Sequence, residues 1–158
     1  MKYLYLLILI TFFNEINAKN VSCNFEEVYQ DGSIQHGHML FKNGLLRYEY
    51  NDKQLFTIIF NNDYFIIRND DKNNVSMLDN NIILNELKTV IDNYPKIKSS
   101  YNNDEIKIRL FESKDYNFLK RISINSPDAN LSIYFLNCNF EDISKRYFQP
   151  FLLPEIKK

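Results

Sequence analysis

His36 and His38 are the only histidines in the chain, and imidazole is the commonest metal ligand and the usual acid–base group near neutral pH. They lie two residues apart in a segment with strand character, so both side chains would project from one face. A zinc site needs a third protein ligand, and none is marked nearby. A hydrogen-bonded surface pair explains the same spacing. We therefore predict neither a metal nor a cofactor.

The residues before these histidines indicate a turn rather than a catalytic triad. Asp31 and Ser33 precede His36 too closely in sequence to be arranged as nucleophile, base and orienting acid. The chain also lacks a Gly-rich phosphate loop, a nucleophile elbow and an HExxH motif. The sequence therefore predicts that the protein is not an enzyme.

Charge is nearly balanced along the chain, with 19 Lys and Arg against 20 Asp and Glu and a net charge of −1. The adjacent acidic pairs Glu26-Glu27 and Asp70-Asp71 are interpreted as solvated charges of a turn and a strand edge. No basic stripe is present, so we expect no nucleic-acid partner. The chain contains 13 Phe and 11 Tyr but no Trp, and this composition alone decides little. In an exported β-sheet without enzyme motifs, such aromatic content points to an apolar ligand rather than a polar substrate.

The N-terminus has the layout of a secretory signal. Lys2 precedes an apolar run from Tyr3 to Phe13, and a short polar stretch ends in the small residue Ala18. The run is shorter than the roughly 20 residues that span a bilayer, although a retained membrane anchor is the alternative. We expect cleavage near Ala18, with residues 1–18 as signal peptide and 19–158 as one exported domain.

Cys23 and Cys138 are the only cysteines. In an exported protein they form a candidate disulfide, and a bridge that closes so long a loop would stabilise the fold by several kcal/mol. Lipid attachment to Cys23 is an alternative, although the residues Asn20-Val21-Ser22 lack the Leu usual at such sites. Sequence does not show whether the two cysteines are close in space, so both interpretations stay open.

Strand patterns separated by polar turns dominate the chain up to residue 78. The pair Asn43-Gly44 is the strongest signal for a two-residue hairpin. In the segment 45–50, Leu46, Tyr48 and Tyr50 alternate with Leu45, Arg47 and Glu49, so the two sets lie on opposite faces. The predicted strands are Val21–Tyr29, Ser33–Lys42, Leu45–Tyr50, Gln54–Phe60, Tyr64–Arg68 and Val75–Leu78.

The apolar period then changes to that of a helix over residues 81–94, and Pro95 ends it. A helix after a strand meander must lay its apolar stripe on one sheet face, where it either lines a pocket or packs as ordinary core. Residues 97–103 are predicted as a polar linker, and the tail from residue 147 onward is expected to pack irregularly along an edge. Further strands are predicted over Glu105–Phe111, Phe118–Asn125 and Leu131–Phe140.

The segment from Asp31 to Arg68 carries the most specific pattern. It contains Gln30-Asp31-Gly32, Gly37, Leu40-Phe41-Lys42, Asn43-Gly44 and Leu46-Arg47-Tyr48-Glu49-Tyr50, followed by two aliphatic and aromatic strands. This order resembles the periplasmic outer-membrane lipoprotein carrier family, the LolA-like proteins. The run Lys-x-Gly-x-Leu-Arg-Tyr-Glu-Tyr is the most specific part of the resemblance.

The resemblance implies a mainly β (α+β) fold: an incomplete antiparallel β-barrel, or strongly curved sheet, with a helical lid. It implies a monomeric periplasmic carrier that holds the acyl chains of lipoproteins in an apolar cavity. Such a carrier receives its cargo from an inner-membrane exporter and delivers it to an outer-membrane receptor. The lipid-binding residues that it implies are Leu46, Tyr48, Tyr50, Ile58, Phe60, Phe65, Leu84, Leu87 and Ile91.

The chain departs from the family pattern at three places. Only residues 19–22 stand where the family has an opening amphipathic helix. Lys42 stands at the position of an Arg that helps to gate the lid, and an ammonium does not reproduce a guanidinium fork. The second half is also predicted to be one strand pair short.

Three alternatives from other classes stay open. One is a periplasmic lipid- or protein-binding or sensor module on a related sheet, without transport. Another is a small secreted structural domain with a dry core. A hydrolase that uses His36 and His38 is the third.

Overall fold

A single antiparallel sheet organises the fold. The computed structural model describes residues 20–52, 54–61, 64–69, 74–78, 82–102, 105–127 and 129–150. Ten strands within these ranges pair in the order β6-β5-β4-β3-β2-β1-β10-β9-β8-β7, and the sheet is open, with β6 and β7 at its edges. The strands are β1 (Asn20–Tyr29), β2 (Ile34–Lys42), β3 (Leu45–Tyr50), β4 (Phe56–Asn61), β5 (Tyr64–Asn69), β6 (Asn74–Leu78), β7 (Ser100–Asn102), β8 (Lys107–Glu112), β9 (Leu119–Asn125) and β10 (Asn130–Asn139). The prediction of a mainly β fold is confirmed.

Turn chemistry sets the meander from β1 to β4. Asn43 (φ 48°) and Gly44 (φ 84°) both have left-handed backbones, as a two-residue hairpin between right-twisted strands requires. The hairpin aligns Lys42 with Leu45, and the predicted segment 45–50 coincides with β3. In the β1–β2 turn, the Asp31 carboxylate accepts the backbone N–H of Ser33 at 2.9 Å. These local contacts hold the strands in register.

The central strand β1 joins the two halves of the chain. It pairs with β2 on one side and with β10 on the other. Cys23 of β1 and Cys138 of β10 form a disulfide with an S–S distance of 2.02 Å. Cys23 is fully buried, so its sulfur is not available for lipid attachment in this form. The predicted signal peptide lies outside the described residues.

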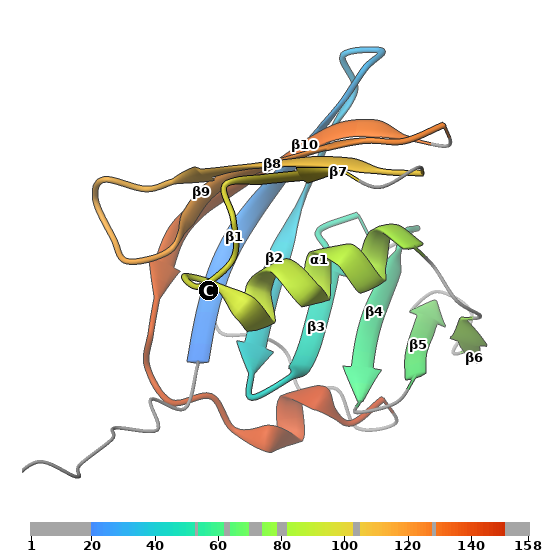
Figure 1. The fold of residues 1–158 in the computed structure, drawn as a ribbon. Coiled ribbons are helices and arrows are strands. Elements are labelled where there is room, and N and C mark those ends of the chain that lie inside the picture. Colours follow the sequence, from blue (N-terminus) through green and yellow to red (C-terminus); the bar gives the residue numbers. More distant parts are fainter. Residues whose placement is uncertain are drawn as a thin grey trace, which may run out of the picture.

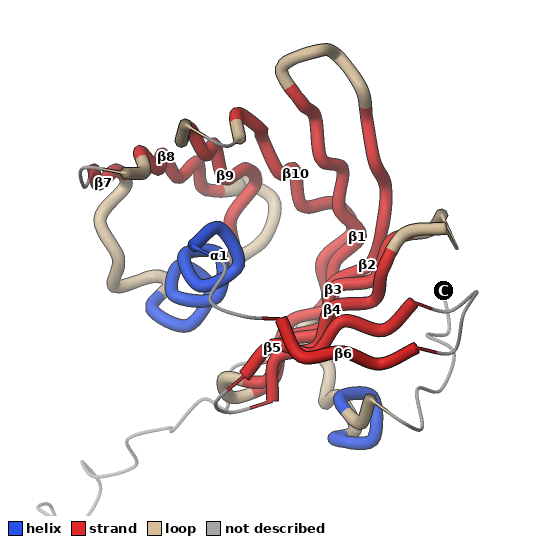
Figure 2. Tube along the Cα trace, turned by 90° about the vertical axis from the view of Figure 1, so that its right-hand side faces the viewer, coloured by secondary structure: helices blue, strands red, loops and turns tan. Residues whose placement is uncertain are grey.

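The sheet is strongly bent, and the helix α1 (Ile82–Asn93) lies in the bend. Figure 1 shows α1 crossing in front of β2, β3 and β4, with β7, β8 and β9 above it. Figure 2, seen from the side, places α1 in the angle between these two groups of strands. Leu84, Leu87, Val90 and Ile91 are its buried residues, so the predicted helix and its apolar stripe are confirmed.

The C-terminal segment covers the opposite face of the sheet. A short 3-10 helix, η1 (Lys145–Phe148), packs against β3 and β4, on the other side of the sheet from α1 (Figure 2). The expectation that this tail packs along an edge is wrong for its described part. The alternation of the strands explains this, because it places apolar side chains on this second face that need cover. They form a second apolar cluster of Leu40, Ile59, Ile66, Ile143 and Phe148.

One predicted linker contains a strand. Within residues 97–103, β7 pairs with β8, aligning Ser100 with Arg109 and Asn102 with Lys107. The sequence SYN has no apolar alternation to reveal a strand, and its pairing depends on a neighbour that follows it in the chain. The second half of the sheet therefore has one strand more than its apolar pattern predicts.

Candidate functional site

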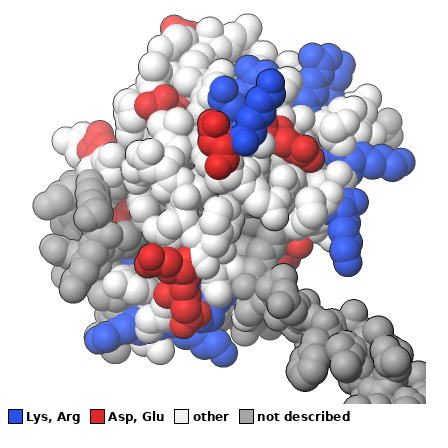
Figure 3. All heavy atoms as spheres, turned by 90° about the vertical axis from the view of Figure 1, so that its left-hand side faces the viewer, with Lys and Arg blue, Asp and Glu red and all other residues white. Residues whose placement is uncertain are grey.

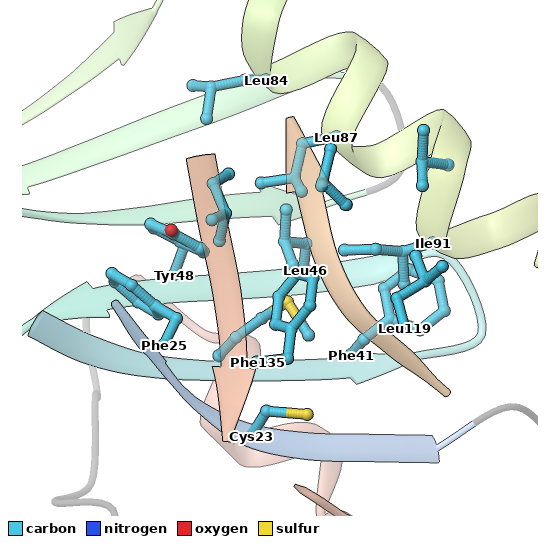
Figure 4. Packing of buried hydrophobic residues seen from close by; sticks show 14 of the residues in the cluster. Cys23, Phe25, Phe41, Leu46, Tyr48, Leu84, Leu87, Ile91, Leu119 and Phe135 are labelled. Atoms are coloured by element: carbon cyan, nitrogen blue, oxygen red, sulfur yellow. The ribbon is translucent and has the colours of Figure 1, made fainter. Parts of the chain in front are cut away.

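A continuous apolar cluster fills the space between α1 and the concave face of the sheet. We call it the apolar interior; it takes side chains from β1–β5, β8–β10 and α1. Figure 4 shows Leu84, Leu87 and Ile91 on the helix side of this cluster and Leu46, Tyr48 and Phe41 on the sheet side. The interior therefore includes β3, β4, β5 and α1, from which the predicted cavity residues come, and also takes side chains from β1, β2 and β8–β10.

The structure brings all nine predicted lipid-binding residues together. Tyr50 is half-buried and packs against the apolar interior, and the other eight are at most 9% exposed. Their side chains fill the interior by contacting one another. The eight buried residues are Leu46, Tyr48, Ile58, Phe60, Phe65, Leu84, Leu87 and Ile91.

Alternation along β3 separates the two faces as predicted. Leu46 and Tyr48 point into the apolar interior, whereas Arg47 is buried on the other face. The Arg47 guanidinium donates to the Tyr147 backbone carbonyl at 3.4 Å and pairs with the Glu49 carboxylate. Arg47 thus helps to attach the C-terminal segment.

A buried carboxylate lies at one end of the apolar interior. Glu27 is only 5% exposed, and its carboxylate accepts hydrogen bonds from three phenols: Tyr48 at 2.8 Å, Tyr29 at 2.6 Å and Tyr50 at 3.0 Å. We call these four residues the tyrosine cluster. The interpretation of Glu27 as a solvated charge is wrong, because β1 is central in the sheet and alternation turns Glu27 to the concave side with Cys23.

Stacked rings connect the tyrosine cluster to the interior. The ring of Phe25 stacks on that of Tyr48, with centroids 3.8 Å apart, and meets Tyr50 edge-on at 5.5 Å. Gly37 makes room for this arrangement, because a Cβ there would lie 2.1 Å from the Phe25 ring and 2.3 Å from the Glu49 carbonyl oxygen. A glycine at this point of β2 is therefore a packing requirement.

Burial and the charge of Glu27 raise the pKa values of all three tyrosines in the cluster. Desolvation, followed by the negative charge of Glu27, raises the pKa of both Tyr48 and Tyr50. Desolvation and the hydrogen bond to Glu27 likewise raise the pKa of Tyr29. All three phenols therefore stay protonated over a wider pH range and act as donors to the carboxylate.

A pocket of about 360 Å³ opens beside the tyrosine cluster. It lies between the β1–β2 turn and the segment that connects β3 to β4. Tyr29 and Tyr50 belong both to the cluster and to the pocket wall. The described residues that line it are Tyr29, Asp31, Ser33, Gln35, Tyr50, Leu55 and Phe56. Sequence reasoning did not assign Glu27 and Tyr29 to this site. Their spacing of two residues from Phe25 along a strand was the available signal, because it places all three side chains on one face.

Lys42 does not reach the helix. It lies at the end of β2 on the face opposite α1, where its ammonium pairs with Asp142 and donates to the Ile143 carbonyl at 2.6 Å. The hydrogen bond that Lys42 donates to Asp142, together with the positive charge of Lys42, lowers the pKa of Asp142. Lys42 thus attaches the C-terminal segment to β2, on the face of the sheet opposite α1.

Both histidines have partners on the sheet face opposite α1. His38 bonds the Ser22 hydroxyl at 3.0 Å and the Asn24 amide oxygen at 2.8 Å, and His36 lies 3.5 Å from Glu26. Across the ranges that the structure describes, no three His, Cys, Asp or Glu side chains gather as a possible metal site. Asp31 and Ser33 bond each other within their turn, as the sequence predicts.

The molecular face in Figure 3 carries both acidic and basic side chains, some of them side by side, among uncharged surface. A scan against protein-family models finds no match, and a search of the curated proteins also finds none. None of the helices in the described ranges combines the length and the apolar character that a bilayer crossing needs. The site is therefore interpreted from its own geometry.

Proposed function

We propose that the protein is an exported, periplasmic carrier that binds the acyl chains of lipoproteins in the apolar interior. In this proposal α1 is the lid of an incompletely closed barrel. The carrier takes cargo from an inner-membrane exporter and passes it to an outer-membrane receptor. The observation that supports it is the position of α1, a helix whose apolar stripe lies against the concave face of an open sheet.

The way α1 is attached supports a movable lid. Its buried residues belong to the apolar interior, so the helix contacts the sheet through apolar side-chain packing. The helix is held mainly by the four buried side chains Leu84, Leu87, Val90 and Ile91. These side chains are buried in the apolar interior in this structure, so α1 must move before an acyl chain reaches the concave face of the sheet.

The free energies involved allow an acyl chain to replace the buried side chains of α1. Exposing four aliphatic side chains costs about 6–12 kcal/mol, at 1.5–3 kcal/mol each. Burying about twelve methylenes of an acyl chain returns roughly 10 kcal/mol. The two terms are of the same size, so the ligand is held without becoming trapped, as a carrier requires.

Photolabelling with a diazirine-bearing fatty acid tests this proposal. Labelled peptides are expected from α1 and from β3–β5, whose side chains form the apolar interior. Labels confined to residues 140–150, on the other face, would contradict it. Native mass spectrometry of the protein isolated from the exported fraction then identifies any acylated species that it carries.

Two isoleucines provide a matched pair of variants. Ile91 of α1 lies in the apolar interior and Ile59 of β4 in the second apolar cluster, and both are 0% exposed. Each Ile→Ala change is expected to cost about 2–5 kcal/mol of stability. Only Ile91→Ala should change acyl binding, tightening it by about tenfold, because less apolar surface must be exposed when α1 moves aside. Equal effects of the two variants on binding would refute the assigned site.

A binding module without transport is the second candidate. The observation in its favour is that eight of the nine predicted cavity residues are buried within one apolar cluster. Such a module would keep its interior closed to hydrophobic dyes and fatty acids. A stable complex with a protein partner and without lipid would favour it over the carrier.

A further inference from the structure

We propose that the pocket beside the tyrosine cluster binds an organic ammonium group, such as a trimethylammonium headgroup. This proposal goes beyond acyl binding and does not depend on it, because the pocket opens at the end of the sheet, outside the apolar interior. Its volume of about 360 Å³ is in the range of ordinary small-molecule sites.

Aromatic rings supply the first element of recognition. Tyr29, Tyr50 and Phe56 all line the pocket, and Phe56 is 43% exposed, so its ring is open to a ligand. The faces of such rings attract cations through their quadrupoles, and several rings around one opening form the usual cage for quaternary ammonium groups. Leu55 adds apolar surface that suits the methyl groups of such a cation.

Negative charge supplies the second element. The Glu27 carboxylate lies behind Tyr29 and Tyr50 and takes part in none of the ion pairs of the described residues. Among the described residues, the donors to this carboxylate are the three neutral phenols. Asp31 adds a second carboxylate at the rim, and its hydrogen bonds with Ser33 lower its pKa. None of the described lining residues is a Lys or an Arg.

The same geometry disfavours a metal ion as the occupant. Metal binding needs several oxygen or nitrogen ligands that converge on one point. The Glu27 oxygens already accept three phenol hydrogens, and Asp31 is engaged with Ser33. A bulky cation that binds through ring faces and diffuse charge needs no free lone pair. An organic ammonium group thus matches the lining better than Ca²⁺ or Zn²⁺.

A pair of nearly isosteric probes isolates the role of charge. Choline and 3,3-dimethylbutan-1-ol have almost the same shape, but only choline is positive. Calorimetric titration of the purified protein should show choline binding about tenfold more tightly than the alcohol. Equal affinities, or no binding of choline, would overturn the proposal. Neither outcome would bear on acyl binding, since neither probe has an acyl chain.

Variants at exposed positions locate the site without threatening the fold. Phe56→Ala should weaken choline binding by about three- to fivefold, because one ring of the cage is lost. Phe140→Ala is the matched control, since Phe140 is similarly exposed (47%) but lies away from the pocket. Asp31→Asn should also weaken choline binding while leaving the alcohol unaffected. Unchanged choline affinity in both pocket variants would refute the assigned location.

Discussion

The residue with the most unusual environment is Glu27. A carboxylate in an apolar surrounding is costly unless each oxygen finds donors. Here Tyr48 donates to one oxygen, while Tyr29 and Tyr50 donate to the other. The neutral phenols satisfy the carboxylate without a cation, which makes the tyrosine cluster sensitive to the loss of any single hydroxyl.

Tyr48→Phe is expected to destabilise the protein by about 1–3 kcal/mol. The ring still stacks on Phe25, but the buried oxygen Oε1 of Glu27 loses its donor. Urea unfolding measures the change. Tyr134→Phe is the control, because Tyr134 is only half-buried and accepts a long 3.3 Å bond from Arg121; its cost should be much smaller. Equal costs would show that the hydroxyl of Tyr48 has no special role.

The tyrosine cluster also predicts sensitivity to alkaline pH. The pKa values of Tyr29, Tyr48 and Tyr50 are raised in the folded state above the unfolded value of about 10. Their stabilising contribution is therefore complete below about pH 10 and is lost as pH rises toward the folded pKa values, because the unfolded state then binds fewer protons. Urea unfolding between about pH 8 and about pH 11 measures the decrease in the free energy of unfolding. Tyr50→Phe should make it shallower, and an unchanged slope would contradict the prediction.

At the scale of elements, the close approach of β1, β2 and β3 depends on a glycine with ordinary strand backbone. Gly37 aligns with Phe25 on one side and with Tyr50 on the other. The Phe25 ring occupies the space where a side chain at position 37 would stand. The stacking of Phe25 on Tyr48 thus requires a residue without a side chain at position 37.

Gly37→Ala is expected to destabilise the fold by about 2–3 kcal/mol or more, because one of the clashing atoms is the backbone carbonyl oxygen of Glu49. Gly44→Ala is the matched control. Its Cβ meets open space, so the cost there is about 1–2 kcal/mol and comes from the left-handed φ of 84° alone. Denaturant midpoints compare the two. A milder effect at position 37 than at 44 would show that the sheet relaxes around the clash.

On the scale of the whole molecule, both faces of one sheet are covered by different parts of the chain. α1 covers the concave face, and the segment after β10 covers the other through Ile143 and Phe148. The N-terminal and C-terminal strands meet at the centre, where β1 pairs with β10. The Cys23–Cys138 bridge crosses this pairing and holds the two halves of the sheet together.

Removal of the disulfide should cost about 4–5 kcal/mol, as expected for a closed loop of this length. The two cysteines are separated by 115 positions, so the bridge strongly restricts the unfolded chain. The double variant Cys23→Ala, Cys138→Ala should unfold at lower urea concentration than the oxidised protein. Dithiothreitol should shift the parent protein toward the variant and leave the variant unchanged. If dithiothreitol, added to the unfolded parent protein, does not change its urea midpoint after refolding, the Cys23–Cys138 bridge is absent in solution.

Sequence alone determined the features that depend on neighbouring residues. Asn43-Gly44 predicted its hairpin because only such residues tolerate two left-handed backbones in succession. Alternation predicted that Leu46 and Arg47 lie on opposite faces, and the helical period predicted the stripe of α1. All nine residues proposed for lipid binding then gather in one interior, because strand and helix periods sort side chains by face.

Only the tertiary structure decided which partner each face receives. Alternation placed Glu27 on one side of its strand, but its burial follows from the pairing of β1 with both β2 and β10. The pairing of β7, the cover formed by η1 and the position of Lys42 likewise depend on segments distant in sequence. Local periodicity shows which residues share a face. Which distant segment packs on that face is determined by the free energy of the whole packed sheet.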